Sequence, residues 1–306
     1  MNSQDLSKVF SRWPHQDSVK IEWNLGKRCN YDCSYCPASI HDNTSPHTGI
    51  DLIKTTIDKL SSLGKPVRLS FTGGEPCVHP KFQEIVKYAK FKGIHWISVT
   101  TNGTLPYEFY ASLSVDQIVF SLHLEYDWRR VFNTVESVHD LTKIKVIAQI
   151  MAHHEHMPAV MQLRAKCLLA KIPSTIRRIR WTEGDHNLFD DMRYHPDDYK
   201  FIIDNESTVS PNTVIVYKNK QEVFKHSNDI IKEHLNQFKD WTCYAGLESL
   251  MINWDGEVHR ATCRVGGSLG NIYQETFEVP KDTVTCTRDW CTCSADIPLT
   301  KLAPTE

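Results

Sequence analysis

The sequence has no apolar run close to the roughly 20 residues that a helix needs to cross a bilayer. Residues 1–18 also lack the apolar core of a signal peptide, so we expect a cytoplasmic protein without a membrane partner. No charge of one sign dominates, because 35 Lys and Arg against 37 Asp and Glu give a net charge of −2. That balance does not point to a nucleic-acid partner, although it does not exclude one. In a reducing compartment, ten cysteines favour metal ligation over disulfides.

Three of these cysteines lie close together in the stretch R-C-N-Y-D-C-S-Y-C-P, residues 28–37. Cys29, Cys33 and Cys36 form a C-x3-C-x2-C array with no fourth cysteine nearby. A structural zinc site or a closed iron–sulfur cluster takes four protein ligands. Three thiolates instead fit a cubane cluster in which one iron remains open to a small molecule. The alternative is half of a zinc site completed elsewhere, but zinc sites usually contain C-x2-C pairs.

A second motif, F-T-G-G-E-P, occupies residues 71–76. The order and separation of the two motifs resemble those of the radical S-adenosylmethionine (SAM) superfamily. The resemblance implies that the open iron of a 4Fe–4S cluster chelates SAM and that an electron cleaves a carbon–sulfur bond of the sulfonium. The resulting 5′-deoxyadenosyl radical would abstract a hydrogen from the substrate. An electron donor such as flavodoxin or ferredoxin would then be a partner. The matching residues are Cys29, Cys33, Tyr35, Cys36, Gly73, Gly74, Glu75 and Pro76.

The same resemblance implies several contacts to SAM. Tyr35 would lie beside the adenine, and the Gly73–Gly74 backbone would approach the amino group, since neither residue has a Cβ. Glu75 belongs to the motif, with no proton transfer assigned to it. Relatives hydrogen-bond the SAM ribose and carboxylate from the positions held here by Asn102, Ser121 and His123, although an N-G dipeptide is also a turn signal.

Two further groups of basic residues have open interpretations. Arg178 and Arg180 share one face of an expected strand, where one could pair with the SAM carboxylate or an anionic substrate if that face points inward. If it points outward, they form a solvated patch. His153, His154 and His156 follow the preceding strand and could exchange protons near a substrate, or lie in a solvated loop.

Residues 18–181 predict an α/β fold, because six apolar strand patterns alternate with helical ones. Such βαβ units form a mainly parallel sheet, which right-handed crossovers would curl into a partial (βα)6 barrel. Each motif follows a strand, at the end where barrels build active sites. We expect residues 1–17 to be a leader with a short helical piece and residues 182–240 to be a connector.

Residues 241–306 predict a small auxiliary domain that contains a β-hairpin. The D-G turn at residues 255–256 lies between two strand patterns, which is a strong hairpin signal. The C-x-A-G, D-G, cysteine and G-N-I pattern is similar to SPASM and twitch auxiliary-cluster domains, although the full seven-cysteine complement is absent. We expect one auxiliary cluster of the 4Fe–4S type, with four-ligand zinc as the alternative. The candidate ligands are Cys243, Cys263, Cys286, Cys291 and Cys293. Cys291 and Cys293, only one residue apart, are the expected ligands from the C-terminal end, and Cys286 is an alternate or a fourth ligand.

No residue of the sequence identifies the substrate. The auxiliary-domain resemblance favours a peptide or protein, while a small molecule, in particular a nucleotide or a nucleic-acid base, is the alternative. A protein of another class, a metal-stabilised binding protein without catalysis, is a second alternative. It would have no evident reason to retain both the cysteine array and G-G-E-P.

Overall fold

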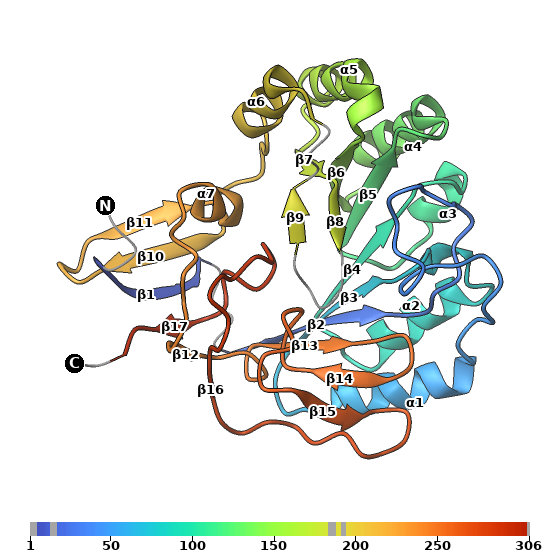
Figure 1. The fold of residues 1–306 in the computed structure, drawn as a ribbon. Coiled ribbons are helices and arrows are strands. Elements are labelled where there is room, and N and C mark those ends of the chain that lie inside the picture. The colour runs from blue at the N-terminus through green and yellow to red at the C-terminus, as the bar shows by residue number, and fades with distance from the viewer. Residues whose placement is uncertain (1–4, 13–16, 183–187, 191–193, 305–306) are drawn as a thin grey trace. The chain divides into compact units, whose positions relative to one another are not determined.

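The computed structural model describes residues 5–12, 17–182, 188–190 and 194–304 (Figure 1). The backbone contacts divide the chain into two compact units. Unit 1 comprises Met1–Trp23, Thr55–Leu69 and Ser210–Glu306, and unit 2 comprises Asn24–Lys54 and Ser70–Val209. These units do not coincide with the four functional segments expected from the sequence. Those segments stay predictions, since a compact unit is defined by backbone contacts and not by a role.

Unit 2 is built on parallel strands that alternate with helices along the chain. The register pairs Val99 with Ile118, Phe120 with Ala148, and Ile150 with Ile176, all in parallel. Its strands are β4 (Trp96–Thr101), β5 (Gln117–His123), β6 (Lys145–Ala152), β7 (Ser174–Arg178), β8 (Arg180–Thr182) and β9 (Leu188–Asp190). Its helical segments are η2 (Pro76–Val78), α2 (Phe82–Phe91), α3 (Tyr107–Ala111), α4 (Trp128–Leu141), η3 (His154–His156), α5 (Met157–Leu169) and α6 (Pro196–Asp204).

The sequence explains why α4 begins where it does and which face it buries. Asp127 caps the helix, because its side chain accepts a hydrogen bond from the N–H of Arg130 at 3.2 Å. Apolar residues then recur at helical spacing and are all buried. They are Trp128, Val131, Phe132, Val135 and Val138.

Strands β2 (Val19–Asn24) and β3 (Val67–Thr72) and helix α1 (Ile50–Ser61) each cross a boundary between the two units. Both strands bury alternate residues, which is the period-2 pattern that the sequence displays. Strands β2 to β7 therefore alternate with helices α1 to α5 along the chain, and β4 to β7 run parallel. The prediction of an α/β fold with a partial barrel is confirmed.

Unit 1 contains a six-stranded sheet in the order β11-β10-β1-β17-β12-β16. Its strands are β1 (Leu6–Ser11), β10 (Thr213–Tyr217), β11 (Glu222–Lys225), β12 (Thr242–Cys243), β16 (Val284–Thr285) and β17 (Lys301–Leu302). The expected helical piece in residues 1–17 is wrong where the structure describes it, because residues 6–11 pair with β10 and β17. Helix α7 (Ser227–Lys232) follows β11 along the chain.

The expected hairpin of unit 1 is present. Strands β13 (Ser249–Ile252) and β14 (Glu257–His259) pair antiparallel, and β15 (Ser268–Asn271) pairs with β14. Gly256 has a φ of 87°, and a Cβ there would lie 2.4 Å from the ring of Tyr273. Glycine is therefore required at this turn for both its conformation and its size.

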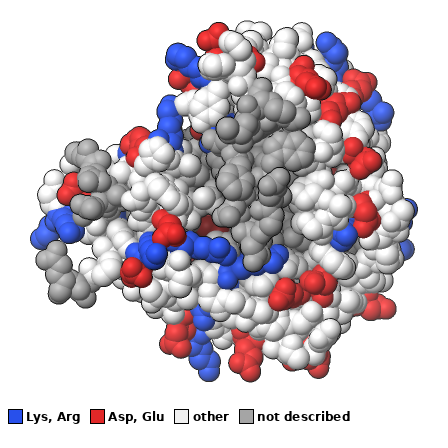
Figure 2. Space-filling view, in the orientation of Figure 1, with Lys and Arg blue, Asp and Glu red and all other residues white. Residues whose placement is uncertain are grey.

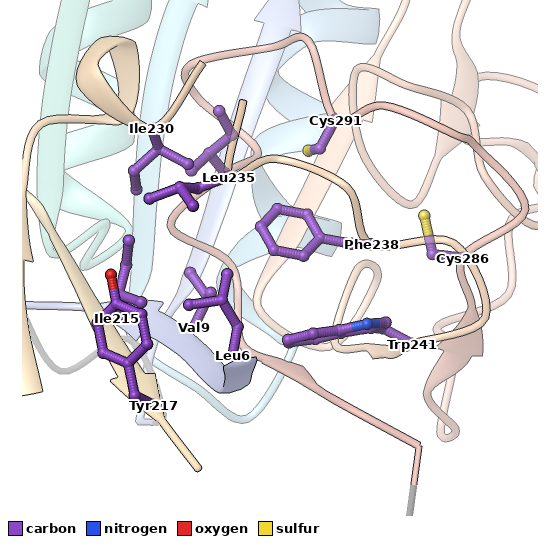
Figure 3. Close-up of a cluster of buried hydrophobic side chains, with 11 residues drawn as sticks. Leu6, Val9, Ile215, Tyr217, Ile230, Leu235, Phe238, Trp241, Cys286 and Cys291 are labelled. Carbon is purple, nitrogen blue, oxygen red and sulfur yellow. The ribbon is translucent and has the colours of Figure 1, made fainter. Parts of the chain in front are cut away.

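The core of unit 1 surrounds part of the second cysteine group. Figure 3 shows Cys286 and Cys291 beside Phe238 in a cluster of buried apolar side chains. In Figure 2, acidic and basic side chains are interspersed over the visible face, in keeping with the small net charge. None of the helices in the described residues has the length and apolar character required to cross a membrane.

Candidate active site and auxiliary cysteine group

The two sequence motifs lie against each other in unit 2. The N–H of Gly74 donates to the carbonyl of Gly26 at 2.8 Å, and the N–H of Glu75 donates to the carbonyl of Arg28 at 2.8 Å. A Cβ on Gly73 would lie 2.6 Å from the Gly26 carbonyl oxygen, and one on Gly74 would lie 2.2 Å from that of Lys27. The two glycines therefore admit the backbone that leads into the cysteine array, a contact that the sequence alone did not indicate.

Glu75 connects the end of β3 to the end of β4. Its buried carboxylate accepts hydrogen bonds from the Thr101 hydroxyl at 2.8 Å, the Asn102 N–H at 2.5 Å and the Cys77 N–H at 2.9 Å. Burial raises the pKa of Glu75, although these three donors act in the opposite direction. The arrangement gives Glu75 a role in positioning the loops after two neighbouring strands.

Asn102 extends this network to the cysteine loop. Its amide nitrogen donates to the side-chain oxygen of Asn30 at 2.7 Å and lies 4.0 Å from the sulfur of Cys29. Its oxygen accepts hydrogen bonds from the N–H and hydroxyl of Thr104. Asn102 is buried, so its side chain holds the first cysteine of the array against the loop that follows β4.

Residues after β5 hold the middle of the cysteine loop. The rings of Tyr31 and Tyr126 stack with centroids 3.7 Å apart, and the Tyr126 hydroxyl accepts from the N–H of Asp32 at 2.7 Å. The Glu125 carboxylate accepts from the N–H of Ser34 at 3.1 Å. The sequence motifs did not indicate Glu125 and Tyr126, although both lie directly after the strand that ends in His123, which is an available signal.

His123 lies between Tyr35 and the second cysteine. Its Nδ1 is 2.7 Å from the Tyr35 hydroxyl and 3.3 Å from the sulfur of Cys33. Burial lowers the pKa of His123 to about 4, so the imidazole is neutral near pH 7. Burial is also the main cause that raises the pKa of Tyr35. The neutral imidazole of His123 therefore contacts both the Tyr35 hydroxyl and the Cys33 sulfur within the cysteine loop.

The three thiols of the array influence one another. Burial, followed by Glu125 and Cys36, raises the pKa of Cys33 to about 12. Burial and the nearby Cys29 raise that of Cys36 to about 11, and burial raises that of Cys29. Without a metal the three thiols are therefore protonated at neutral pH. Binding of the cysteines to iron would release these protons.

The structure also locates the remaining predicted residues of unit 2. Ser121 is buried on β5, where its hydroxyl lies 3.5 Å from the amide nitrogen of Gln149. The Arg178 guanidinium donates to the Tyr199 hydroxyl of α6 at 3.0 Å and lies over its ring. Both contacts engage the guanidinium at α6, and the role of Arg178 at SAM stays a prediction. The side chain of Arg180 lies outside the described residues.

His153 is the buried member of the histidine group, and its ring lies beside that of Tyr35. Its ring centroid is 5.9 Å from that of Tyr35, and its Nε2 is 3.7 Å from a Glu125 oxygen. Burial lowers the pKa of His153. A neutral His153 can accept a proton, and proton exchange at this end of β6 stays a prediction.

Asp42 is a third residue of the site that the sequence patterns did not indicate. Its carbonyl accepts from the N–H of Cys29 at 2.7 Å, and its N–H donates to the carbonyl of Lys27 at 3.0 Å. Its carboxylate accepts from the hydroxyl and N–H of Ser45 at 2.6 and 2.7 Å and pairs with the Lys27 ammonium at 3.3 Å. Asp42 thus closes the cysteine loop at its far end.

The second cysteine group lies entirely in unit 1. Burial raises the pKa of Cys263 to about 12 and that of Cys293 to about 11, and it also raises those of Cys243 and Cys291. After burial, Asp296 and the neighbouring thiols Cys243 and Cys286 add to the raised pKa of Cys263, and Asp296 with Cys263 and Cys293 adds to that of Cys291. These effects indicate one group of neighbouring thiols, as the auxiliary site requires.

The donor sets fit iron–sulfur clusters in their chemistry. Among the residues that the structure describes, no three His, Cys, Asp or Glu side chains converge as ligands of one metal ion. In a cubane, each thiolate binds a different iron, so its ligands do not converge on a single point. Soft thiolates without carboxylate ligands suit iron–sulfur clusters or zinc.

Comparison with curated proteins gives partial matches. The Fe-coproporphyrin III synthase of Methanosarcina barkeri is 38% identical over 105 residues, which are 34% of this chain and 26% of that protein. The S-adenosylmethionine-dependent nucleotide dehydratase of Selenomonas ruminantium is 35% identical over 88 residues, which are 29% of this chain and 31% of that protein. The matches therefore span less than a third of the length of these relatives.

The fold is similar to solved structures over most of the chain. Native anSMEcpe with bound AdoMet and Cp18Cys peptide gives a TM-score of 0.58 at 15% identity, over 85% of this chain and 78% of that one. Streptococcus suis SuiB bound to S-adenosylmethionine gives 0.57 at 13% identity, over 85% and 64%. At sequence identities this low, the similarity shows a shared fold only.

A family model described as the Radical SAM superfamily matches residues 23–157. The matched region includes both the cysteine array and G-G-E-P, the two loops that the structure joins through main-chain hydrogen bonds. Residues 23–157 therefore form a domain of the radical SAM superfamily.

Proposed function

We propose that this chain is a radical SAM enzyme in which Cys29, Cys33 and Cys36 hold the catalytic 4Fe–4S cluster. The observation that carries the proposal is the pair of main-chain hydrogen bonds from Gly74 and Glu75 to the backbone directly before Cys29. They make the cofactor motif and the ligand loop one rigid structure. When bound, the cluster would supply the electron for reductive cleavage of SAM, and the resulting 5′-deoxyadenosyl radical would abstract a hydrogen from the substrate.

The residues around the array are proposed to bind and orient SAM. Tyr35 and His123 support each other through the 2.7 Å hydroxyl–imidazole contact, which fixes the ring proposed to lie beside the adenine. Ser121, on the same strand as His123, and Asn102, after the neighbouring strand, would provide polar contacts to the ribose and carboxylate. Gly73, Gly74 and Glu75 complete the proposed set mainly by positioning the backbone.

Arg178 has the least support among the proposed cofactor contacts. Its guanidinium is engaged by Tyr199, so it would have to leave that partner before it could bind the SAM carboxylate. An R178K variant tests this role, because lysine keeps the charge but loses the planar guanidinium that pairs bidentately with a carboxylate. A raised KM for SAM would support the assignment, and an unchanged KM would remove Arg178 from the site.

The C-terminal cysteines are proposed to hold one auxiliary cluster in unit 1. Five cysteines provide one more thiol than a four-ligand cluster needs. Cys291 and Cys293 are the proposed late ligands, and Cys243 and Cys263 precede them. Cys286 is the alternate or a fourth ligand, and its sulfur lies 3.8 Å from the carbonyl oxygen of Arg288. The auxiliary cluster would bind substrate or transfer electrons.

The substrate is proposed to be a peptide or a protein. The support is the likeness of the fold to a structure with a bound peptide, together with the cysteine-bearing C-terminal unit. A nucleotide is the alternative, and it is favoured by the local identity with a nucleotide dehydratase. A flavodoxin or ferredoxin is the proposed class of electron donor.

The decisive experiment uses protein purified and reconstituted without oxygen. Iron and sulfide are measured per chain, and 5′-deoxyadenosine is assayed after addition of dithionite and SAM. We expect about eight irons per chain and SAM cleavage in the parent, because the two proposed cubane clusters would hold four irons each. A triple alanine variant of Cys29, Cys33 and Cys36 should retain about four irons and lose cleavage. Cys167→Ala, a change at a buried cysteine of α5, is the matched control that should keep both.

The other outcomes are equally informative. About four irons and one zinc with intact cleavage would leave the catalytic proposal standing and make the C-terminal site a structural zinc site. Zinc without iron, together with no cleavage of SAM, would contradict the proposal that this chain is a radical SAM enzyme. It would favour the alternative of a metal-stabilised binding protein without catalysis. Peptide and nucleotide panels then test the substrate, and SAM-dependent deuterium transfer from a labelled nucleotide would overturn the peptide proposal.

A further inference from the structure

A lysine is buried within the C-terminal cysteine group. Lys301 of β17 is 1% exposed, and its ammonium donates to the carbonyls of Asp296, Ile297 and Leu299 at 2.7, 3.0 and 3.1 Å. These three bonds use all the N–H donors of the ammonium. The Lys301 ammonium is therefore fully hydrogen-bonded and fixed in position by the three carbonyls.

The neighbours that bind this ammonium carry no formal charge. Besides the three carbonyls, the ring of Phe238 lies 5.2 Å from Nζ. Within the part of the chain that the structure describes, no carboxylate forms an ion pair with Lys301. Lysine is almost never fully buried without a charged partner, because removing an ammonium from water is costly. The burial of Lys301 therefore calls for nearby negative charge.

The groups whose negative charge would act on Lys301 are three cysteines and Asp296. Cys243 on β12 is the direct cross-strand partner of Lys301 on β17, so their side chains start from adjacent positions. Burial alone would lower the pKa of Lys301, but negative charge on Cys291, Cys243 and Asp296 raises it. Burial raises the pKa of the Asp296 carboxyl, which also accepts from the Cys263 N–H at 3.1 Å. Thiolates bound to metal would supply the charge that Lys301 lacks.

We propose that Lys301 is a fixed positive charge that stabilises the thiolate ligands of the auxiliary cluster and raises its reduction potential. The inference rests on the proposed function, because it takes the C-terminal cysteines to bind iron and sulfide. Reduction adds one negative charge to a cluster, and a buried cation beside the ligands stabilises the reduced form more than the oxidised form. Lys301 is a positioning and charge-compensating residue and does not contact the reacting atoms.

Three substitutions separate charge from hydrogen bonding. K301R keeps the charge, K301Q keeps N–H donors for the carbonyls without charge, and K301M removes both. If the charge is what matters, Gln and Met should behave alike and Arg should resemble the parent. If Lys301 only ties three carbonyls together, Gln should resemble the parent and Met alone should fail.

The measurement is the midpoint potential of the auxiliary cluster, followed by electron paramagnetic resonance, together with iron and sulfide content. It is made in the full chain with Cys29, Cys33 and Cys36 changed to alanine, so that only the auxiliary cluster contributes. We expect K301Q to lower the equilibrium constant for reduction at least tenfold, which is about 59 mV for a one-electron couple. Lys59→Gln is the matched control, since Lys59 is also a lysine of unit 1 that donates to a backbone carbonyl, that of Ile272 at 3.0 Å.

Each outcome decides the inference. A lowered potential in K301Q, or loss of its cluster while K301R retains one, supports the charge role. A K301Q cluster with full iron content and the parent potential overturns it. If the background with Lys301 intact contains no iron and sulfide, the proposed auxiliary cluster itself fails, which is a result distinct from an unchanged potential.

Discussion

The main-chain N–H of Glu75 donates a 2.8 Å hydrogen bond to the carbonyl of Arg28, the residue immediately before Cys29. The side chain of Glu75 simultaneously accepts from Thr101 and Asn102 at the end of β4. One residue thus joins the cysteine loop to the loops after β3 and β4. This geometry gives G-G-E-P a function in holding the array that does not depend on any direct contact with SAM.

The first prediction concerns the close approach of Gly74 to the backbone before Cys29. In Gly74→Ala, the new Cβ would lie 2.2 Å from the carbonyl oxygen of Lys27 and 2.4 Å from that of Arg28. Backbone must move, so we expect a loss of about 1–3 kcal/mol in the free energy of unfolding. We also expect less iron at the first array, measured by iron content after reconstitution.

Gly49→Ala is the matched control for this change. Gly49 also belongs to unit 2, has no positive φ, and a Cβ there meets nothing within 4 Å. Its stability and iron content should equal those of the parent within error. If the Gly74 and Gly49 variants had the same stability and iron content, the hydrogen bonds between G-G-E-P and the backbone before Cys29 would not be needed to hold the cysteine array.

The second prediction concerns the buried carboxylate of Glu75. In Glu75→Gln, one end of the side chain becomes an N–H2 group that faces the N–H of Asn102 and cannot accept from it. An unsatisfied buried donor costs about 1–3 kcal/mol, which urea unfolding would detect. Glu84→Gln, a change at an ion-paired residue on the surface of α2, should cost less than about 1 kcal/mol. If the Glu75→Gln variant were as stable as the parent, the hydrogen bonds of the Glu75 carboxylate would not be needed.

Local sequence patterns predicted most of unit 2. Period-2 alternation located β3 and β6, and helical spacing of apolar residues located α4, because both periods are properties of neighbouring residues. The positions of Cys29 and Glu75 after successive strands followed from the same patterns. Their direct contact did not, because a hydrogen bond between two loops has no periodic signal.

Long-range pairing accounts for what the sequence did not predict. Residues 6–11 form β1 because they pair with β10 and β17, each more than 200 residues away, and the helical expectation considered only neighbours. Residues 222–225 form β11 by pairing with β10, which ends at Tyr217, so this strand belongs to a local hairpin. Lys301 resembles any surface lysine in the sequence, since only the fold buries it. Tertiary context therefore overrode the local sequence signal at residues 6–11 and at Lys301.

The third prediction resolves the surplus cysteine of unit 1. Single alanine variants are made at Cys243, Cys263, Cys286, Cys291 and Cys293. Because a cubane takes four thiolates, we expect four variants to lose about four irons each and one to retain them. Iron and sulfide analysis measures this directly, and Cys77→Ala in unit 2 serves as a control for removal of a buried thiol. Retention of iron by two or more variants would contradict a four-cysteine ligand set.

The last prediction concerns acid stability and the turn that closes the cysteine loop. Hydrogen bonds from the hydroxyl and N–H of Ser45 hold the pKa of Asp42 below its usual range. A carboxyl with a lowered folded-state pKa contributes stability above its unfolded pKa of about 3.9, and this contribution is lost as pH falls through the folded value. Stability of the metal-free parent should therefore decline below about pH 4, in part through Asp42.

Asp42→Asn isolates that contribution. The asparagine oxygen can still accept from the N–H groups of Thr44 and Ser45, so the turn is retained while the titration is removed. We expect the variant to be less stable than the parent at pH 7 and to lose less stability between pH 5 and 3 in urea unfolding. Asp51→Asn, at an exposed position in the first turn of α1, is the control. If the Asp42 and Asp51 variants had the same pH dependence as the parent, Asp42 would not be the acid-sensitive residue of the cysteine loop.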